Sequence, residues 1–115
     1  MGIRLEYKGD DAVILVMPQT VAKDAVGQMR DLAQTLIKKA VKRVVLDFSG
    51  VERIDSQGLG QIAAFHITMQ KAHVLCAIAG IGNKVIRELF AITNLDKVIK
   101  IFDSIPEALR GLAEA

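Results

Sequence analysis

Residues 44–60 have the sequence VVLDFSGVERIDSQGLG, and they decide how the rest of the chain is interpreted. The apolar run Val44–Phe48 predicts a buried strand, which Ser49 and Gly50 end. From Leu59 onward apolar residues recur at helical spacing, so a helix is expected to begin at Asp55-Ser56. A strand, a turn and a helix therefore follow one another within these residues.

Asp55 and Ser56 occupy the expected start of the helix. Both residue types are favoured there because their side-chain oxygens accept hydrogen bonds from backbone N–H groups without an intrahelical partner. A plain helix cap accounts for the pair. Gly58 and Gly60 favour a further role, since each costs the helix roughly 1 kcal/mol relative to alanine and leaves Ser56 open to contact. A serine hydroxyl placed in this way can accept a phosphoryl group, and the helix dipole would favour the resulting anion.

Composition limits the class of protein. The chain has 115 residues, of which 51% are hydrophobic and 24% charged, and this predicts a single compact domain over residues 1–115. The formal net charge is only +2 and basic residues alternate with acidic ones, so we expect no nucleic-acid partner. No apolar run is as long as a membrane span and the N-terminus is unlike a signal peptide, so we expect a cytoplasmic protein without a membrane partner. The single cysteine, Cys76, lies in an apolar run and predicts a small buried side chain.

The remaining residues predict an alternation of strands and helices. Apolar and charged residues alternate over residues 3–8, and a turn at residues 9–11 would join this strand to a fully buried one at residues 12–17. Thr20 can cap a helix whose apolar stripe comprises Ala22, Ala25, Val26, Met29, Leu32, Ala33, Leu36, Ile37 and Ala40. Later come a strand at residues 74–79, a helix capped by Asn83, a short strand at residues 98–102 and a terminal helix capped by Ser104. We therefore predict an α/β fold with an N-terminal hairpin strand, a small mixed sheet with a parallel centre, and about four helices.

The helix that follows Ser56 has two different faces. One is apolar and predicts a core contact through Leu59, Ile62, Ala63, Phe65 and Met69. The opposite face is small and uncharged as far as Lys71, and carries Gln57, Gln61, Ala64 and Thr68. Because this face begins beside Ser56, it predicts a reversible protein-docking surface, with an ordinary solvated helix face as the alternative.

Catalytic and ligand-binding sets cannot be assembled from the sequence. No histidine or lysine is placed beside Ser56, so we expect no enzyme, no cofactor and no metal. His66 and His73 lack a third metal ligand at a suitable spacing, and we interpret them as core or boundary histidines with satisfied hydrogen bonds. The Gly80-Ile81-Gly82 sequence lacks the further residues of phosphate-binding loops.

The hexapeptide Asp55-Ser56-Gln57-Gly58-Leu59-Gly60, with the strand before it and residues 87–95 (RELFAITNL) after it, resembles the STAS domain family. Within that family the chain is most similar to the single-domain bacterial anti-sigma factor antagonists, over nearly its whole length. In those proteins the serine directly after the aspartate is reversibly phosphorylated by a partner kinase, which implies that Ser56 is a phosphoserine site. Gln57 departs from the small residue usual at that position, and residues 17–20 lack a glycine that family members often have.

The resemblance implies a protein-binding switch in partner-switching signal transduction. The unmodified protein would bind an ATP-using serine protein kinase that is also an anti-sigma factor, phosphorylation would release it, and a phosphoserine phosphatase would restore binding. The expected binding residues are Asp55, Ser56, Gln57, Gly58, Leu59, Gln61, Ala64 and Thr68. The output would be a sigma factor, and so transcription regulation, or another process such as biofilm formation.

Two functions of other classes stay open at this point. One is a nucleotide-binding or small-anion-binding STAS module that uses the helix N-terminus and residues 80–82 as donors. The other is a structural subunit of a transporter or of a signalling scaffold.

Overall fold

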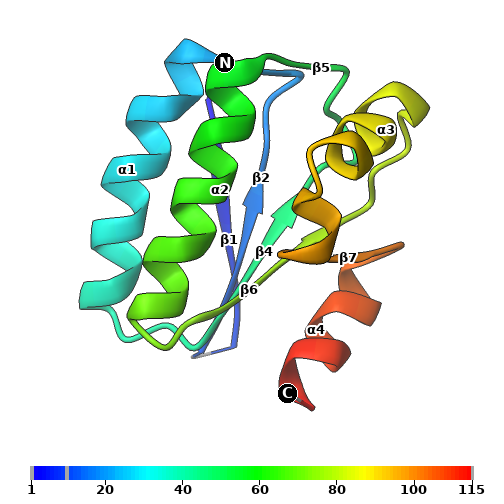
Figure 1. The fold of residues 1–115 in the computed structure, drawn as a ribbon. Coiled ribbons are helices and arrows are strands. Elements are labelled where there is room, and N and C mark those ends of the chain that lie inside the picture. Colours follow the sequence, from blue (N-terminus) through cyan, green and yellow to red (C-terminus); the bar gives the residue numbers. More distant parts are fainter. Residues whose placement is uncertain (1, 10, 115) are drawn as a thin grey trace.

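A five-stranded sheet in the order β1-β2-β4-β6-β7 forms the centre of the computed structural model, which describes residues 2–9 and 11–114 (Figure 1). Asp10 of the predicted turn and the side chain of Val26 lie outside the described part. The elements are β1 (Arg4–Lys8), β2 (Ala12–Val16), β3 (Thr20–Val21), α1 (Lys23–Lys38), β4 (Arg43–Asp47), β5 (Arg53–Ile54), α2 (Ser56–Lys71), β6 (Leu75–Ala79), α3 (Lys84–Ile92), the 3₁₀ turn η1 (Leu95–Lys97), β7 (Lys100–Phe102) and α4 (Ile105–Ala113).

Strand directions confirm the predicted mixed sheet. β1 and β2 form an antiparallel hairpin, while β2, β4, β6 and β7 pair in parallel. In the register of the parallel centre, Val44 of β4 lies opposite Val13 of β2 and Cys76 of β6. The strand predicted from residues 44–48 is therefore the middle strand of the sheet.

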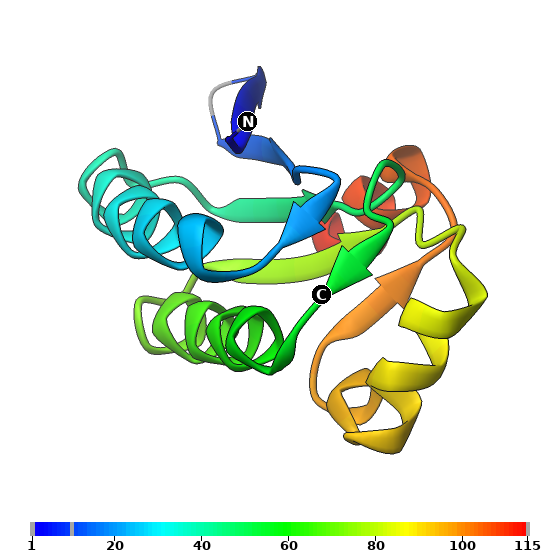
Figure 2. The same ribbon diagram turned by 90° about the horizontal axis from the view of Figure 1, so that it is seen from above.

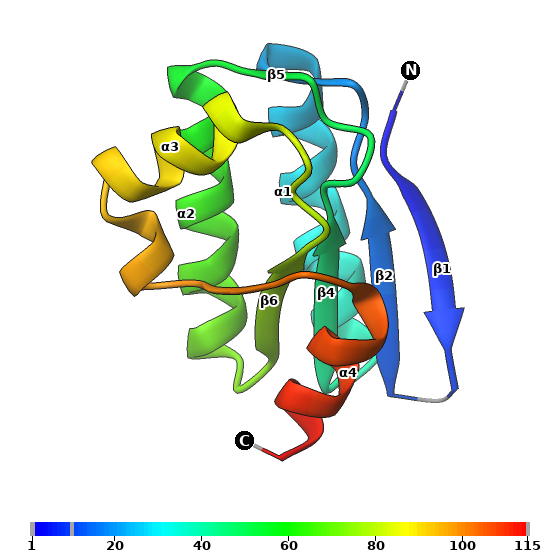
Figure 3. The same cartoon turned by 90° about the vertical axis from the view of Figure 1, so that its right-hand side faces the viewer.

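Helices cover both faces of the sheet, as Figures 2 and 3 show: α1 and α2 lie side by side on one face and α4 lies on the other. The crossovers from β2 to β4 and from β4 to β6 step in the same direction along the sheet, so their right-handed connections place α1 and α2 on the same side. α3 joins the core on that side through Ile86 and Phe90. α4 covers a smaller core on the opposite side, formed with Ile14, Val45, Ala77 and Ala79.

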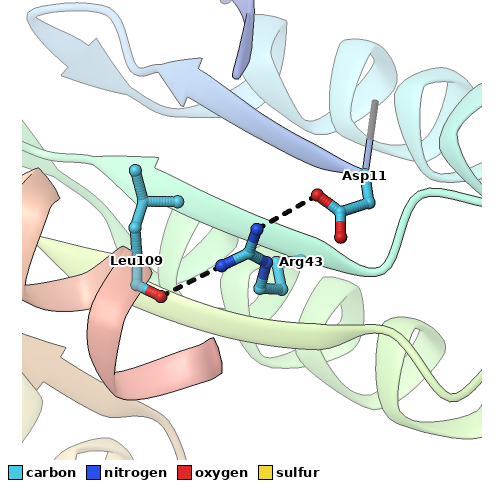
Figure 4. A network of polar contacts seen from close by, with 3 residues as sticks. All are labelled: Asp11, Arg43 and Leu109. Carbon is cyan, nitrogen blue, oxygen red and sulfur yellow. Dashed lines mark hydrogen bonds and ion pairs between the residues drawn. The ribbon is translucent and has the colours of Figure 1, made fainter. Parts of the chain in front are cut away.

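One arginine at the start of β4 links this strand to neighbouring segments (Figure 4). Arg43 Nη2 donates to Asp11 Oδ1 at 3.0 Å, and Arg43 Nη1 donates to the carbonyl oxygen of Leu109 at 3.2 Å. The half-buried guanidinium therefore joins the start of β2, the start of β4 and the terminal helix α4.

The predicted cap of α1 is wrong. Thr20 and Val21 form the short strand β3, which pairs in parallel with β5, and α1 begins at Lys23 after Ala22, whose side chain makes no capping bond. Threonine is common both as a helix cap and in strands, and here pairing with Arg53 and Ile54 supplies the strand partner that the local sequence does not show.

The other predicted caps are confirmed. Asn83 Oδ1 accepts from the N–H groups of Val85 and Ile86, and Ser104 Oγ accepts from the N–H of Glu107 at 3.3 Å. These caps fix where α3 and α4 begin.

Candidate functional site

Asp55 caps α2, as predicted. Its Oδ1 accepts from the backbone N–H of Gly58 at 2.7 Å, and its own backbone is extended, as expected for an N-cap residue. Ser56 is the first residue of the helix and its side chain is exposed. The capping bond is made by Asp55, so the neighbouring hydroxyl is accessible and is not the acceptor of that bond.

A two-stranded parallel ladder holds the Asp55-Ser56 corner, the point where the chain passes from β5 into α2. β3 and β5 pair Thr20 with Arg53 and Val21 with Ile54, and the N–H of Asp55 donates to the Val21 carbonyl oxygen at 3.3 Å. The backbone immediately before Ser56 is thus held by β3, a segment more than thirty residues earlier in the chain.

The loop before β3 makes further contacts with the same corner. The carbonyl oxygen of Gln19 accepts from the N–H groups of Glu52 at 2.8 Å and Arg53 at 3.1 Å, and the Gln19 side chain also donates to the Glu52 carboxylate. Sequence reasoning missed this support because two-residue strands are too short to show a period. The adjacent β-branched residues Thr20 and Val21 are the only local signal.

Gly58 and Gly60 have different roles, and the single interpretation given to both from the sequence is wrong for Gly58. A Cβ atom at Gly58 would lie 2.2 Å from the Val21 carbonyl oxygen and 2.9 Å from Ile54 Cγ1, whereas at Gly60 it would meet nothing within 4 Å. Gly58 is buried and lets α2 approach β3 closely. Gly60 is exposed and lies over open space.

The two faces of α2 are arranged as the helical spacing predicts. Ile62, Phe65 and Met69 are buried, and Leu59 packs partly against the same core. The opposite face is open to solvent through Gln57, Ala64, Thr68 and Lys71, with Gln61 half-buried. Of the eight predicted binding residues, the structure therefore exposes Asp55, Ser56, Gln57, Ala64 and Thr68, half-buries Gln61, and places Gly58 and part of Leu59 in the packing.

The glycines after β6 lie in an unfavourable setting for an anion. Gly80 has φ +79, which glycine adopts without strain, and its N–H already donates to the Phe102 carbonyl oxygen at 3.1 Å. A Cβ at Gly80 would lie 3.5 Å from Asp47 Oδ1, so a carboxylate occupies the space beside this turn. Both features weigh against a phosphate site that uses residues 80–82 as donors.

His66, on α2, differs from its sequence interpretation. Its side chain is half-buried, and its Nδ1 is buried without a hydrogen-bond partner among the described residues, so it is not a satisfied histidine. Burial lowers the pKa of His66 below its usual value. Within residues 2–9 and 11–114, no group of three or more histidine, cysteine or acidic side chains is placed to hold a metal ion.

Cys76 is buried in the core, as predicted, and burial raises the pKa of its thiol to about 12. The thiol is therefore protonated at neutral pH. Among the described helices, none is both long and apolar enough to cross a membrane.

Comparison with protein families decides the relationship of the chain. The model of the STAS domain matches residues 7–108. The chain belongs to the STAS domain family. The Asp55-Ser56 corner, the five-stranded sheet and the helices all lie within or overlap the matched STAS region.

Relatives of this STAS protein include one from Thermotoga maritima that is provisionally named an anti-sigma factor antagonist. It is 31% identical over 105 residues, which is 90% of this chain and 92% of the relative. A crystal structure of an anti-sigma factor antagonist from the same organism, also provisional in name, matches with a TM-score of 0.83 and 26% identity, covering 96% of this chain and 94% of the other.

The fold is also that of the anti-sigma factor antagonist SpoIIAA in its unphosphorylated form, with a TM-score of 0.73 at 18% identity and 98% coverage of both chains. SpoIIAA of Bacillus in its phosphorylated form matches with a TM-score of 0.74 at 19% identity, covering 96% of this chain and 98% of the other. The mixed sheet with four helices is thus the fold of STAS anti-sigma factor antagonists.

Proposed function

We propose that this STAS protein is a phosphorylation-controlled protein-binding switch of the anti-sigma factor antagonist type, and that Ser56 is the residue that is phosphorylated. The proposal rests on one observation: Asp55 makes the capping bond of α2, which leaves the neighbouring Ser56 side chain exposed. The names of the relatives support the class of function, and SpoIIAA has been solved in both unphosphorylated and phosphorylated forms.

The fold is expected to tolerate the modification. A phosphoserine carries about −1.5 to −2 charges at neutral pH, and at Ser56 these charges would lie beside the Asp55 carboxylate. The N-terminal end of the helix dipole offsets part of the repulsion, by roughly 0.3–1 kcal/mol. The hydrogen bonds that hold the corner run through the Gln19 and Val21 carbonyl oxygens and the Asp55 side chain, none of which phosphorylation of Ser56 removes.

An interface that covers Ser56 would respond much more strongly. Burying a phosphate without a partner charge costs several kcal/mol, and each 1.4 kcal/mol is a factor of ten in affinity. We therefore expect phosphorylation to weaken binding by about a thousandfold, which is sufficient to release the partner.

The proposed docking surface is the exposed α2 strip, defined as Ser56, Gln57, Gln61, Ala64 and Thr68. The strip is uncharged before modification. The Thr68 hydroxyl donates to the Ala64 carbonyl oxygen at 2.9 Å, so this hydroxyl already has a hydrogen-bond acceptor within the helix. A partner that covers these five residues desolvates no charge among them. Asp55, Gly58 and Leu59 contribute by shaping the corner and packing the helix.

The proposed partner is a serine protein kinase that uses ATP and also acts as an anti-sigma factor, and a phosphoserine phosphatase would reverse the modification. The names of the relatives favour a sigma factor as the regulated output. This proposal is preferred over the nucleotide-binding function because Asp47 and the occupied N–H of Gly80 disfavour an anion at the second half of that site.

The test is mass spectrometry of the phosphorylated protein combined with calorimetry against the anti-sigma-type kinase of the same genome. Phosphate is expected on Ser56, and Ser56→Ala should bind the kinase without being modified. Ser56→Asp introduces a single charge and should weaken binding by about a hundredfold.

A matched variant separates the position of the charge from its presence. Gln34 is exposed on α1 and is not part of the strip, so Gln34→Glu adds one negative charge on a different helix and should leave affinity within about twofold. Full kinase affinity in Ser56→Asp, or phosphate on another residue only, would contradict the proposed switch.

A further inference from the structure

A cavity of about 380 Å³ lies at the C-terminal end of α2, away from the Ser56 corner. Its walls come from the last turns of α2, the turn that follows it, the first residues of β6, the segment entering β7 and the last turn of α4. β7 has three residues and pairs only with Ala77–Ala79, so Leu75 and Cys76 extend beyond the strand beside them. The short edge strand is thus the structural reason for the cavity.

The polar lining of the cavity favours a negatively charged group. Lys100, His66, His73 and Gln70 line it, and no aspartate or glutamate does so among the residues that the structure describes. His66 also carries a buried Nδ1 without a hydrogen-bond partner in the described part of the chain. A ligand with acceptor oxygens would find a cation and several side-chain donors there, without a competing carboxylate.

The remaining lining is apolar and includes side chains that are otherwise costly to expose. Val98 is 58% exposed and Leu75 is 39% exposed, while Cys76 and Leu112 are buried. The volume falls in the range of pockets for small organic molecules, which combine apolar walls with a few polar groups. The cationic and apolar parts of the lining together favour a ligand with one anionic end and one hydrocarbon end.

We propose that this cavity binds a small amphipathic carboxylate, such as a medium-chain fatty acid, with the carboxylate at Lys100 and the hydrocarbon against Val98 and Leu112. The protein would then bind a metabolite at the C-terminal end of α2, at a site separate from the exposed α2 strip, which begins at the N-terminal end. It needs neither a partner protein nor phosphorylation.

The probe is octanoate, titrated into the ¹⁵N-labelled full-length protein and followed by heteronuclear NMR. Saturable shifts at millimolar octanoate are expected for residues around Cys76, Val98 and Lys100. Octan-1-ol has the same chain without the charge and should bind about tenfold more weakly, because it lacks the charge-assisted hydrogen bonds.

Two lysine variants test the head-group contact. Lys100→Met should weaken octanoate binding by about tenfold and leave octanol binding unchanged. Lys97 is exposed on η1 and outside the cavity lining, so Lys97→Met should bind octanoate like the unaltered protein. Both changes are at exposed positions, so folding is expected to be retained.

Absence of saturable shifts, shifts spread over the whole surface, equal binding of octanol, or unchanged octanoate affinity in Lys100→Met would each overturn the proposal. Because no partner or phosphate is involved, such a failure would leave the proposal for Ser56 untouched.

Discussion

The two ends of α2 contrast in how completely their polar groups are satisfied. At the N-terminal end, Asp55 caps the helix and the β3–β5 ladder holds the backbone before it. At the C-terminal end, His73 adopts φ +62, a left-handed conformation in which glycine is the usual residue, and His66 Nδ1 is buried without a partner among the described residues. One end is a rigid corner and the other is a strained turn beside a cavity.

The comparison shows that a candidate site can be recognised either by an exposed group among satisfied neighbours or by a cluster of unsatisfied groups. At the Ser56 corner the surrounding groups are satisfied, so a change in the exposed hydroxyl is expected to alter a surface without unfolding the helix. At the His73 end, His66 Nδ1, which has no partner within residues 2–9 and 11–114, lies near exposed apolar side chains and the Lys100 cation, and this combination favours the binding of a ligand. Four changes, taken in order of decreasing effect, test this contrast.

Gly58→Ala should produce the largest loss of stability. The new methyl group would overlap the Val21 carbonyl oxygen at 2.2 Å, and relieving such overpacking costs about 3 kcal/mol. Gly60→Ala is the matched control and should stabilise the protein by about 1 kcal/mol, because its methyl group meets nothing within 4 Å and alanine favours the helix. Urea unfolding of both variants measures the difference, and equal effects would show that the close approach of α2 to β3 is not required.

Asp55→Ala should cost about 1 kcal/mol through loss of the cap. Asp55→Asn keeps an oxygen at the same position and should unfold within a few tenths of a kcal/mol of the unaltered protein. Thermal unfolding followed by circular dichroism compares the two. If both variants lose the same stability, the contribution of Asp55 is its charge near the helix N-terminus and not its capping bond.

His73→Gly should stabilise the protein by roughly 0.5–1 kcal/mol, since glycine adopts a positive φ without the steric cost that other residues carry. Ala40 follows the C-cap residue of α1 and has φ +56, so Ala40→Gly is a benchmark for the same gain at a residue that does not line the cavity. Calorimetric unfolding can measure both. A loss of stability in His73→Gly beside a gain in Ala40→Gly would mean that the His73 side chain itself supports the turn.

Acidification should weaken the fold through His66, and this is the smallest expected effect. Burial lowers the pKa of His66 in the folded state, so the unfolded chain binds a proton more readily as the pH falls below the usual histidine value of 6.5. Stability is then lost from about pH 6.5 downward until the folded-state pKa is reached. His66→Gln should flatten this part of the pH dependence of the unfolding free energy, which urea unfolding at a series of pH values measures.

Much of the fold follows from local patterns. The apolar runs at residues 12–17, 44–48 and 74–79 form strands that are mostly buried, because a parallel centre is covered on both faces; Leu75, at the start of β6, is the exposed exception. The caps Asp55, Asn83 and Ser104 are at helix starts, as predicted. Thr20 was predicted incorrectly because its true partner, Arg53, is distant in the sequence. From the local sequence, a threonine that caps a helix cannot be distinguished from a threonine in a short strand; the pairing with β5 distinguishes them.

The candidate site divides in the same way. The order of residues along α2 already predicted which side chains face solvent, since helical periodicity depends only on sequence spacing. The role of Gly58 could not be predicted, because the atom that a methyl group would meet belongs to Val21. The cavity near His66 was also hidden, since its walls come from α2, β6, β7 and α4.

By itself the sequence determined the helices, the strands of the five-stranded sheet but not β3 and β5, most of the caps, and the position of Ser56 at the start of α2, because these depend on neighbours a few residues apart. Only the tertiary structure decided that Asp55 rather than Ser56 makes the capping bond, that Gly58 is needed for close packing, and that a partly cationic cavity lies at the far end of the same helix. Each of these is decided by which atoms the folded chain brings together in space, and a one-dimensional pattern carries no record of those distances.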